Sequence, residues 1–246
     1  MPLKSTFNYS PNFSLPKRYK KQIKFIIYHY TGMKKESSAI NRLTDIKSGV
    51  SCHYLIKKNG EIVMLVPELY TAWHAGKSCW KNFNSLNKDS IGIEISNPGH
   101  AFHYKKFSND QIISLLKLSK YLIKKYKIDY RNILGHSDIA PERKKDPGEK
   151  FPWEYFSKNK VGLWHNIKVD TLNSARNCKI NIKSKKIFLK NLKKIGYSKN
   201  NEKYSNRDKY QTYVVKAFQR RYRPNLINGK IDKECLIISN ILIKKN

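Results

Sequence analysis

The stretch GHSDIAPERKKDPG, residues 135–148, decides how this chain folds and acts, because it sets His136 and Asp146 ten residues apart around a basic loop. Both side chains are good ligands for first-row metals. A second imidazole, His29, follows the apolar run 25–27, which is typical of a buried strand, and a short apolar run also leads into His136. Two strand ends can therefore meet at one point, where the three side chains predict a metal site.

The ligand types favour a catalytic metal over a structural one. Structural zinc sites usually have four protein ligands that are rich in Cys, whereas catalytic sites use three and leave the fourth position to water. His29, His136 and Asp146 are three ligands, and none is Cys. We therefore predict a zinc ion with an open position, which can activate water for amide hydrolysis. From the two histidines alone, ordinary core or surface positions remain the alternative.

Five motifs in a fixed order resemble one enzyme family. They are FIIYHYTG at 25–32, SCHYLIKKNGEI at 51–62, AWHAG at 72–76, SIGIEISN at 90–97 and the stretch at 135–148. Over residues about 22–165 the chain resembles the zinc-dependent N-acetylmuramoyl-L-alanine amidases of the type-2 amidase family, especially the larger bacterial enzymes with an extra C-terminal module. The resemblance implies zinc ligands at His29, His136 and Asp146, the same residues that ligand chemistry indicates.

The resemblance also implies two catalytic side chains, Glu94 and Lys144. Alternation along the strand puts the three isoleucines of 91–95 on one side and Glu94 on the other. A carboxylate in apolar surroundings has a raised pKa, which suits a general base near neutral pH. An ammonium at Lys144 would stabilise the oxyanion together with the metal. The alternative for Glu94 is a solvated glutamate on an edge strand, and the neighbours Arg143 and Lys145 of Lys144 could be solvated members of the same basic run.

Two further positions bear on the substrate and on the branch of the family. Trp73 and His74 of AWHAG are expected to line the substrate cleft, where Trp73 would offer an apolar face to a sugar ring; packing of Trp73 in the core is the alternative. Cys52 stands where the phage lysozyme and animal recognition-protein branches that resemble this fold have an active-site tyrosine. The chain thus looks like the branch that relies on a glutamate base.

The resemblance implies an enzyme that hydrolyses the amide bond between N-acetylmuramic acid and L-alanine, with Zn2+ as the sole cofactor. The substrate would be peptidoglycan or a soluble (anhydro-)muropeptide, in cell-wall turnover or recycling. The alternative is a non-catalytic muropeptide recognition protein on the same fold, which would need no complete set of ligands, base and lysine. The sequence leaves open the choice between intact sacculus and soluble muropeptide, and the preferred stem peptide.

The pattern along the chain predicts an α/β catalytic domain at 1–165, with a mixed central β-sheet flanked by helices and the zinc site at the strand ends. Strands are predicted at 22–30, 52–57, 61–66, 90–96 and 131–135. Asn59-Gly60 predicts a hairpin between the second and third of these strands. An amphipathic helix is predicted at 108–127, with Ser108 as its N-cap.

A change in the sequence pattern after residue 165, from alternating strands and helices to helical periodicity alone, predicts a second, small all-α domain. Residues 166–185 are polar without clear periodicity and are predicted to be a linker. Helices are predicted at 186–195, 207–222 and 232–244, which gives a three-helix domain at 186–246. Its segment VVKAFQRRYRPNLINGKIDKE, at 214–234, resembles the peptidoglycan-binding module of wall hydrolases. The resemblance implies wall binding, and a stabilising bundle without its own ligand is the alternative.

The net charge of +32 has a compositional origin. Nine of the 50 basic residues are Arg and the rest are Lys, spread along the whole chain. Arg-rich bidentate recognition is nearly absent, so we expect no specific nucleic-acid partner; the charge should instead attract the carboxylates of stem peptides. No apolar run is long enough to predict a transmembrane helix.

We expect the bacterial cell envelope or periplasm, with the cytoplasm as the alternative, and the assembly stays open. The N-terminal segment is polar and lacks the apolar core of a secretory signal, which favours the cytoplasm, whereas the C-terminal module favours the cell envelope or periplasm. The four cysteines are scattered without a pairing pattern, and we expect mostly thiols. Nothing in the sequence indicates an oligomeric state.

Overall fold

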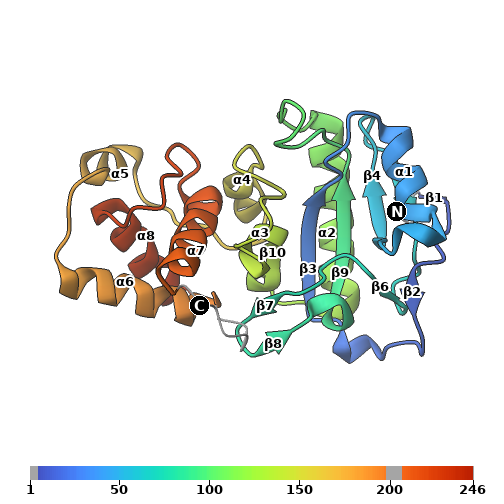
Figure 1. Ribbon diagram of the computed structural model, residues 1–246, viewed down its shortest axis with the longest axis horizontal. Helices are drawn as coiled ribbons and strands as arrows, with labels where there is room; N and C mark the ends of the chain where they lie inside the picture. Colours follow the sequence, from blue (N-terminus) through green and yellow to red (C-terminus); the bar gives the residue numbers. More distant parts are fainter. Residues whose placement is uncertain (1–4, 198–206, 246) are drawn as a thin grey trace.

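The computed structural model describes residues 5–197 and 207–245, and its centre is a six-stranded mixed sheet (Figure 1). The strand order is β1 (Thr6–Phe7), β5 (Ile62–Met64), β4 (Tyr54–Ile56), β9 (Ser90–Ile95), β3 (Phe25–Tyr30) and β10 (Ile133–Gly135). Strands β4, β9, β3 and β10 are parallel, so their carboxyl ends lie along one edge. Strand β5 is antiparallel to β4 and forms the hairpin that Asn59-Gly60 predicts.

The two longest strands read as nearly continuous apolar runs because both faces of the sheet are covered. On one face, Tyr28 and the three isoleucines of β9 pack against α2 (Asn109–Tyr126). Helix α2 begins at Ser108, whose side chain accepts the Gln111 backbone N–H in a capping box. The predicted mixed sheet and its long helix are confirmed, with ends that differ from the prediction by up to three residues.

Short elements complete the sheet domain and were not predicted from sequence. They are η1 (Lys20–Gln22), α1 (Glu36–Thr44), η2 (Ile46–Ser48), η3 (Leu86–Asp89), η4 (Tyr130–Asn132), α3 (His136–Ile139), α4 (Trp153–Lys158), and the strand pairs β2 (Phe13–Ser14) with β6 (Thr71–Ala72) and β7 (Cys79–Trp80) with β8 (Phe83–Asn84). Most of them span two to four residues, too few to show a hydrophobic period. Tertiary contacts rather than local patterns hold them.

Four helices form the C-terminal module: α5 (Val169–Ala175), α6 (Ile182–Ile195), α7 (Arg207–Tyr222) and α8 (Lys233–Lys244). The last three match the predicted helices, but α6 begins four residues earlier. The segment 166–185 is not a bare linker, since it contains α5 and the first turn of α6. Leu172 and Ala175 of α5 are buried, and Leu172 belongs to the same core as the other helices. Two buried positions in one seven-residue helix give too weak a period to be read from sequence.

The C-terminal module shares its core with the sheet. Phe25, Ile27 and Leu134, on the sheet face opposite α2, belong to one apolar cluster with Phe188 and Phe218 of the module. Helix α7 lies against α3, beside β10 (Figure 1). The module is therefore packed on the sheet domain rather than tethered to it. Within the two described ranges, none of the helices combines the length and apolarity needed to cross a bilayer.

Candidate active site

The three predicted ligands meet at the carboxyl-end edge of the sheet. His29 lies near the end of β3, His136 follows β10 directly as the first residue of α3, and Asp146 comes from the loop after α3. The Nδ1 atoms of the two histidines are 2.9 Å apart, and Asp146 Oδ2 lies 3.0 Å from each of them. All three side chains are buried. The parallel strands β3 and β10 thus bring His29 and His136, 107 positions apart, to one point, and the loop after α3 adds Asp146.

The loop that carries Asp146 is folded back onto the strand end. The Ser137 N–H donates to the Asp146 carbonyl oxygen at 2.8 Å, and the Lys144 N–H donates to the Ala140 carbonyl oxygen at 3.0 Å. Gly135 makes this close approach possible, because a Cβ there would lie 2.6 Å from Pro147 Cδ. The first glycine of the stretch at 135–148 therefore has a packing reason.

Hydrogen bonds on the far side of each ring fix the orientation of the ligand nitrogens. His136 Nε2 lies 3.1 Å from the Ala75 carbonyl oxygen, which can only accept, so Nε2 carries the proton. For His29 the partner is His74, with His29 Nε2 3.1 Å from His74 Nδ1. His74 Nε2 in turn lies 3.2 Å from Ser90 Oγ.

The Ser90 hydroxyl sets the direction of this chain. It donates its only hydrogen to the Leu86 carbonyl oxygen at 2.6 Å, so it accepts from His74 Nε2–H. His74 Nδ1 is then an acceptor, and His29 Nε2 donates to it. Both ligand histidines therefore turn an unprotonated Nδ1 toward Asp146, the orientation that such outer partners give to metal-binding histidines.

The converging atoms fit a metal ion. Two imidazole lone pairs and a carboxylate oxygen at 2.9–3.0 Å have no hydrogen to share, and a cation between them satisfies all three. Burial lowers the pKa of His29 to about 4, with a further contribution from His136, so its imidazole stays neutral near pH 7 and able to bind a metal. Among the described residues this is the one cluster with such geometry.

Glu94 lies next to the cluster on β9, in register with His29 on β3. Its Oε2 atom is buried and has no hydrogen-bond partner among the described residues. Burial, together with the charge of Asp146, raises the pKa of Glu94 to about 8, although the charge of Lys144 opposes the shift. This carboxylate lines the same cleft as the three ligands. It is placed and tuned as a base that can take a proton near neutral pH.

The basic residues of the loop lie in different surroundings. Lys144 is half-buried on the cleft wall, and its charge lowers the pKa of both Glu94 and His29. Arg143 instead donates to the carbonyl oxygens of Ala75 and Lys77. The Arg143 guanidinium thus binds the backbone of the AWHAG segment and the residue after it, whereas the charge of Lys144 acts on Glu94 and His29 in the cleft.

The two residues expected to bind substrate are placed differently from each other. Trp73 lines the cleft and is half-buried, with its indole N–H donating to Ser14 Oγ at 2.7 Å. His74 borders the cleft as well, but both of its ring nitrogens are engaged by His29 and Ser90. The hydrogen bonds of His74 support the orientation of His29, and a contact of His74 with substrate stays a prediction. No pattern in the sequence indicates a role for Ser90, a polar residue at the start of an apolar strand.

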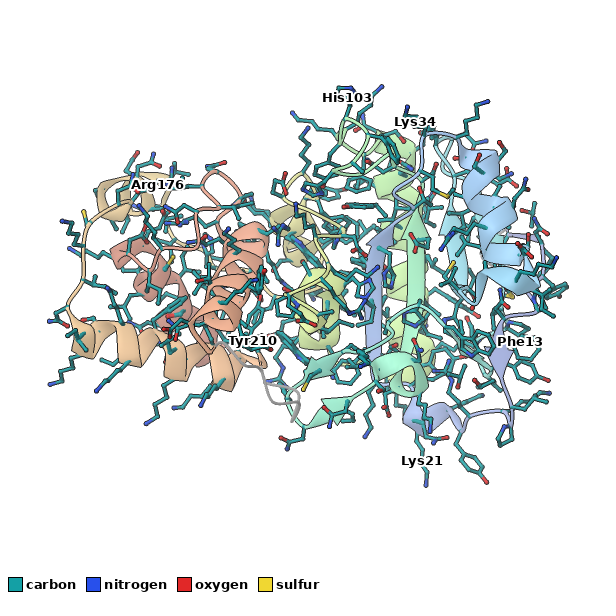
Figure 2. All side chains as sticks on the ribbon, in the orientation of Figure 1. Phe13, Lys21, Lys34, His103, Arg176 and Tyr210 are labelled. Carbon is teal, nitrogen blue, oxygen red and sulfur yellow. The ribbon has the colours of Figure 1, made fainter. Side chains whose placement is uncertain are left out.

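The site opens into a cleft of about 580 Å3. Its walls also include Tyr30 and His100, where the Tyr30 hydroxyl lies 2.9 Å from His100 Nδ1 and His100 Nε2 lies 3.0 Å from a carboxylate oxygen of Glu149. Arg42 also lines the cleft, and together with Lys34 it lines a neighbouring hollow. Figure 2 shows nitrogen-tipped side chains projecting from the sheet domain and the C-terminal module alike, consistent with charge spread over the chain.

A mixed sheet with a His-His-Asp cluster at its strand ends and a partly buried carboxylate beside it has the groups that a metal-dependent hydrolase requires. The chain belongs to the family described as N-acetylmuramoyl-L-alanine amidase, whose model matches residues 19–149. It is 36% identical over 236 residues to the N-acetylmuramoyl-L-alanine amidase AmiD of Escherichia coli K12, covering 91% of this chain and 83% of that protein. The predicted family and enzyme class are confirmed.

Two solved structures resemble the chain over nearly its full length. The complex of Escherichia coli AmiD with anhydro-N-acetylmuramic acid-L-Ala-D-gamma-Glu-L-Lys has a TM-score of 0.78 and 34% identity, and covers 94% of this chain and 93% of that one. The complex of AmpDh3 from Pseudomonas aeruginosa with an anhydromuramic pentapeptide has a TM-score of 0.78 and 29% identity, with 96% of each chain covered. The similarity thus includes the C-terminal module.

Proposed function

We propose that this chain is a zinc-dependent amidase that cleaves the bond between N-acetylmuramic acid and L-alanine in anhydro-muropeptides released from the cell wall. The observation that carries the proposal is the Glu94 carboxylate in register with His29, whose Oε2 atom is buried and has no hydrogen-bond partner among the described residues. A protein that only recognises muropeptides has no use for a carboxylate held at such a cost. The solved relatives hold anhydro-muropeptides, which favours this soluble substrate over intact sacculus.

His29, His136 and Asp146 would hold the zinc ion, a set of three protein ligands that is typical of catalytic sites. When bound, zinc supplies Lewis-acid activation of water and of the scissile carbonyl. The outer hydrogen bonds from His29 to His74 and from His136 to Ala75 keep both ligand nitrogens aimed at the metal position. The chain itself provides the remaining chemistry.

Glu94 acts as the general base. Its raised pKa, about 8, makes the carboxylate a strong enough base to take a proton from the attacking water. The same group, once protonated, gives the proton to the departing L-alanine amine. Lys144 contributes a positive charge to the cleft wall, where it stabilises the oxyanion that develops on the carbonyl oxygen.

The cleft walls supply contacts for both halves of the substrate. Trp73 would offer its ring face to the sugar. Arg42 and Lys145 would attract the carboxylates of the stem peptide. We further propose residues 1–165 as the catalytic domain and 186–246 as a region that contacts the wall, with the segment 166–185 contributing α5 and the first turn of α6 to the same C-terminal module.

The test is cleavage of anhydro-N-acetylmuramyl tripeptide, which is measured as release of the L-alanyl peptide. The zinc-loaded full chain is compared with chelator-treated protein, with chelated protein given zinc again, and with Glu94→Gln protein of verified zinc content. Glu154→Gln serves as a matched control, because Glu154 is an exposed glutamate that pairs with Lys158 on α4. We expect activity that zinc restores and that only Glu94→Gln abolishes at full zinc content.

Two results would change the assignment. Binding of the tripeptide without cleavage by zinc-loaded wild-type protein would favour the recognition protein. Full activity of Glu94→Gln would leave the amidase in place but remove Glu94 as its base.

A further inference from the structure

A second buried carboxylate, Asp138, lies two residues after the ligand His136. It is 1% exposed and belongs to the four-residue helix α3. Its Oδ2 atom accepts the Gly135 backbone N–H at 2.8 Å, which ties the start of α3 to the end of β10. The remaining partners of this carboxylate come from the C-terminal module.

Arg221 of α7 is the main partner. Its Nη1 donates to Asp138 Oδ2 at 2.5 Å, and its Nη2 donates to the Ile133 carbonyl oxygen of β10 at 3.0 Å. The guanidinium carbon also lies 4.1 Å from the ring centre of Trp153 in α4. One buried side chain therefore contacts the strand before His136, the helix that carries it and the helix that follows the metal loop.

Tyr197, which follows α6, completes the arrangement. Its hydroxyl donates to Asp138 Oδ1 at 2.8 Å, and its ring packs against Trp80 of β7 with centroids 4.9 Å apart. Both oxygens of one carboxylate in the sheet domain are thus bound by residues of the C-terminal module.

These contacts are needed because α3 has no means of holding itself. A helix of one turn is far below the length that is stable alone, so its position depends on outside partners. Replacing a buried ion pair with apolar residues is often neutral or stabilising. The presence of the Asp138–Arg221 pair is therefore better explained by the geometry that it fixes than by a gain in folding stability. The geometry in question is that of His136, because metal ligands must be held to within about 0.5 Å.

We propose that Arg221 and Tyr197 are positioning residues for the ligand His136, and that the C-terminal module is in this way part of the metal site. The proposal deepens the function proposed above and rests on it for the identity of the metal. A planar guanidinium reaches the carboxylate and the β10 carbonyl together, which the single ammonium of a lysine does not reproduce. The module then sets metal affinity independently of any contact with the wall.

The test compares full-length variants that differ in one contact. Arg221→Lys removes the planar guanidinium that donates to Asp138 and to the Ile133 carbonyl oxygen together, and Tyr197→Phe removes a single hydroxyl. Arg223→Lys is the matched control: Arg223 is also 2% exposed and lies just beyond α7, but it binds Asp232 and Glu234 inside the module. The measurements are the zinc Kd by competition with a chromophoric chelator, the absorption spectrum of the Co2+-substituted protein, and the melting temperature.

We expect Arg221→Lys to weaken zinc binding 10- to 100-fold, the loss that outer-shell changes cause, and to alter the Co2+ spectrum. Tyr197→Phe should cause a smaller loss in the same direction. Arg223→Lys should lower the melting temperature and leave the zinc Kd and the Co2+ spectrum unchanged.

Unchanged zinc affinity in Arg221→Lys, or in Tyr197→Phe should the first variant fail to fold, would overturn the inference. An equal loss in Arg223→Lys would also overturn it, because general destabilisation would then explain both. Since zinc binding is measured without substrate, Arg221-dependent affinity in a chain that lacks amidase activity would support this inference while contradicting the proposed function.

Discussion

The support of His29 by His74 can be tested through a glycine on the neighbouring strand. Gly92 lies under the His74 ring, and a Cβ at that position would be 2.3 Å from His74 Cγ and 2.5 Å from Nδ1. Real Cβ atoms do not approach other atoms closer than 3.0 Å. The Gly92→Ala substitution therefore pushes the ring away from the strand without adding charge or removing a polar group.

The size of the effect follows from these distances. An ordinary van der Waals contact begins near 3.4 Å, so the ring must move by about 1 Å. The bond from His29 Nε2 to His74 Nδ1 is 3.1 Å long, and such a movement takes it beyond the hydrogen-bond limit. Loss of the outer partner of a metal-binding histidine weakens metal binding about 10- to 100-fold, or about 1.4 to 2.7 kcal/mol.

A double-mutant cycle measures this coupling. Zinc Kd values are determined for wild type, Gly92→Ala, His74→Ala and the double variant. In the His74→Ala background the new methyl group meets no ring, so Gly92→Ala should add little to the loss already present. Wild-type affinity in Gly92→Ala, or additive losses in the double variant, would refute the link from Gly92 through His74 to the metal.

Three other predictions concern catalysis and stability. Lys144→Met should lower kcat about 10²- to 10³-fold, as expected for loss of one oxyanion donor, while zinc content is retained; a change in KM alone in steady-state assays would contradict the role. The pKa of Glu94 is raised from 4.5 to about 8 by folding, so the stability it contributes is present at low pH and lost as the pH rises toward 8. Metal-free Glu94→Gln should therefore melt at a higher temperature than wild type at a pH of about 9 and at the same temperature at about 4, whereas equal melting at both would exclude the raised pKa. Ser108→Ala removes the capping box of α2 and should cost about 1 kcal/mol in denaturant unfolding; an unchanged midpoint would show that the cap is dispensable.

Local sequence was sufficient for the longer elements and for the types of the candidate ligands. The apolar runs of β3 and β9 and the spacing of leucines in α2 reflect burial that repeats at the period of each element, so they are visible in one dimension. His29, His136 and Asp146 were nominated because imidazole and carboxylate are metal ligands whatever surrounds them. These parts of the prediction depended on residue type and period alone.

Tertiary structure alone decided how those ligands are supported. His74 was expected to face substrate, and only the fold shows its ring between His29 and Ser90, across Gly92. In the same way, Arg221 reaches Asp138 across 83 positions of sequence. Hydrogen bonds between distant residues follow no period and leave no local pattern, because they form only where packing brings two elements together. The sequence by itself therefore determined the chemistry that the site can contain, and the packing of the C-terminal module and of β9 decided which side chains hold that chemistry in place.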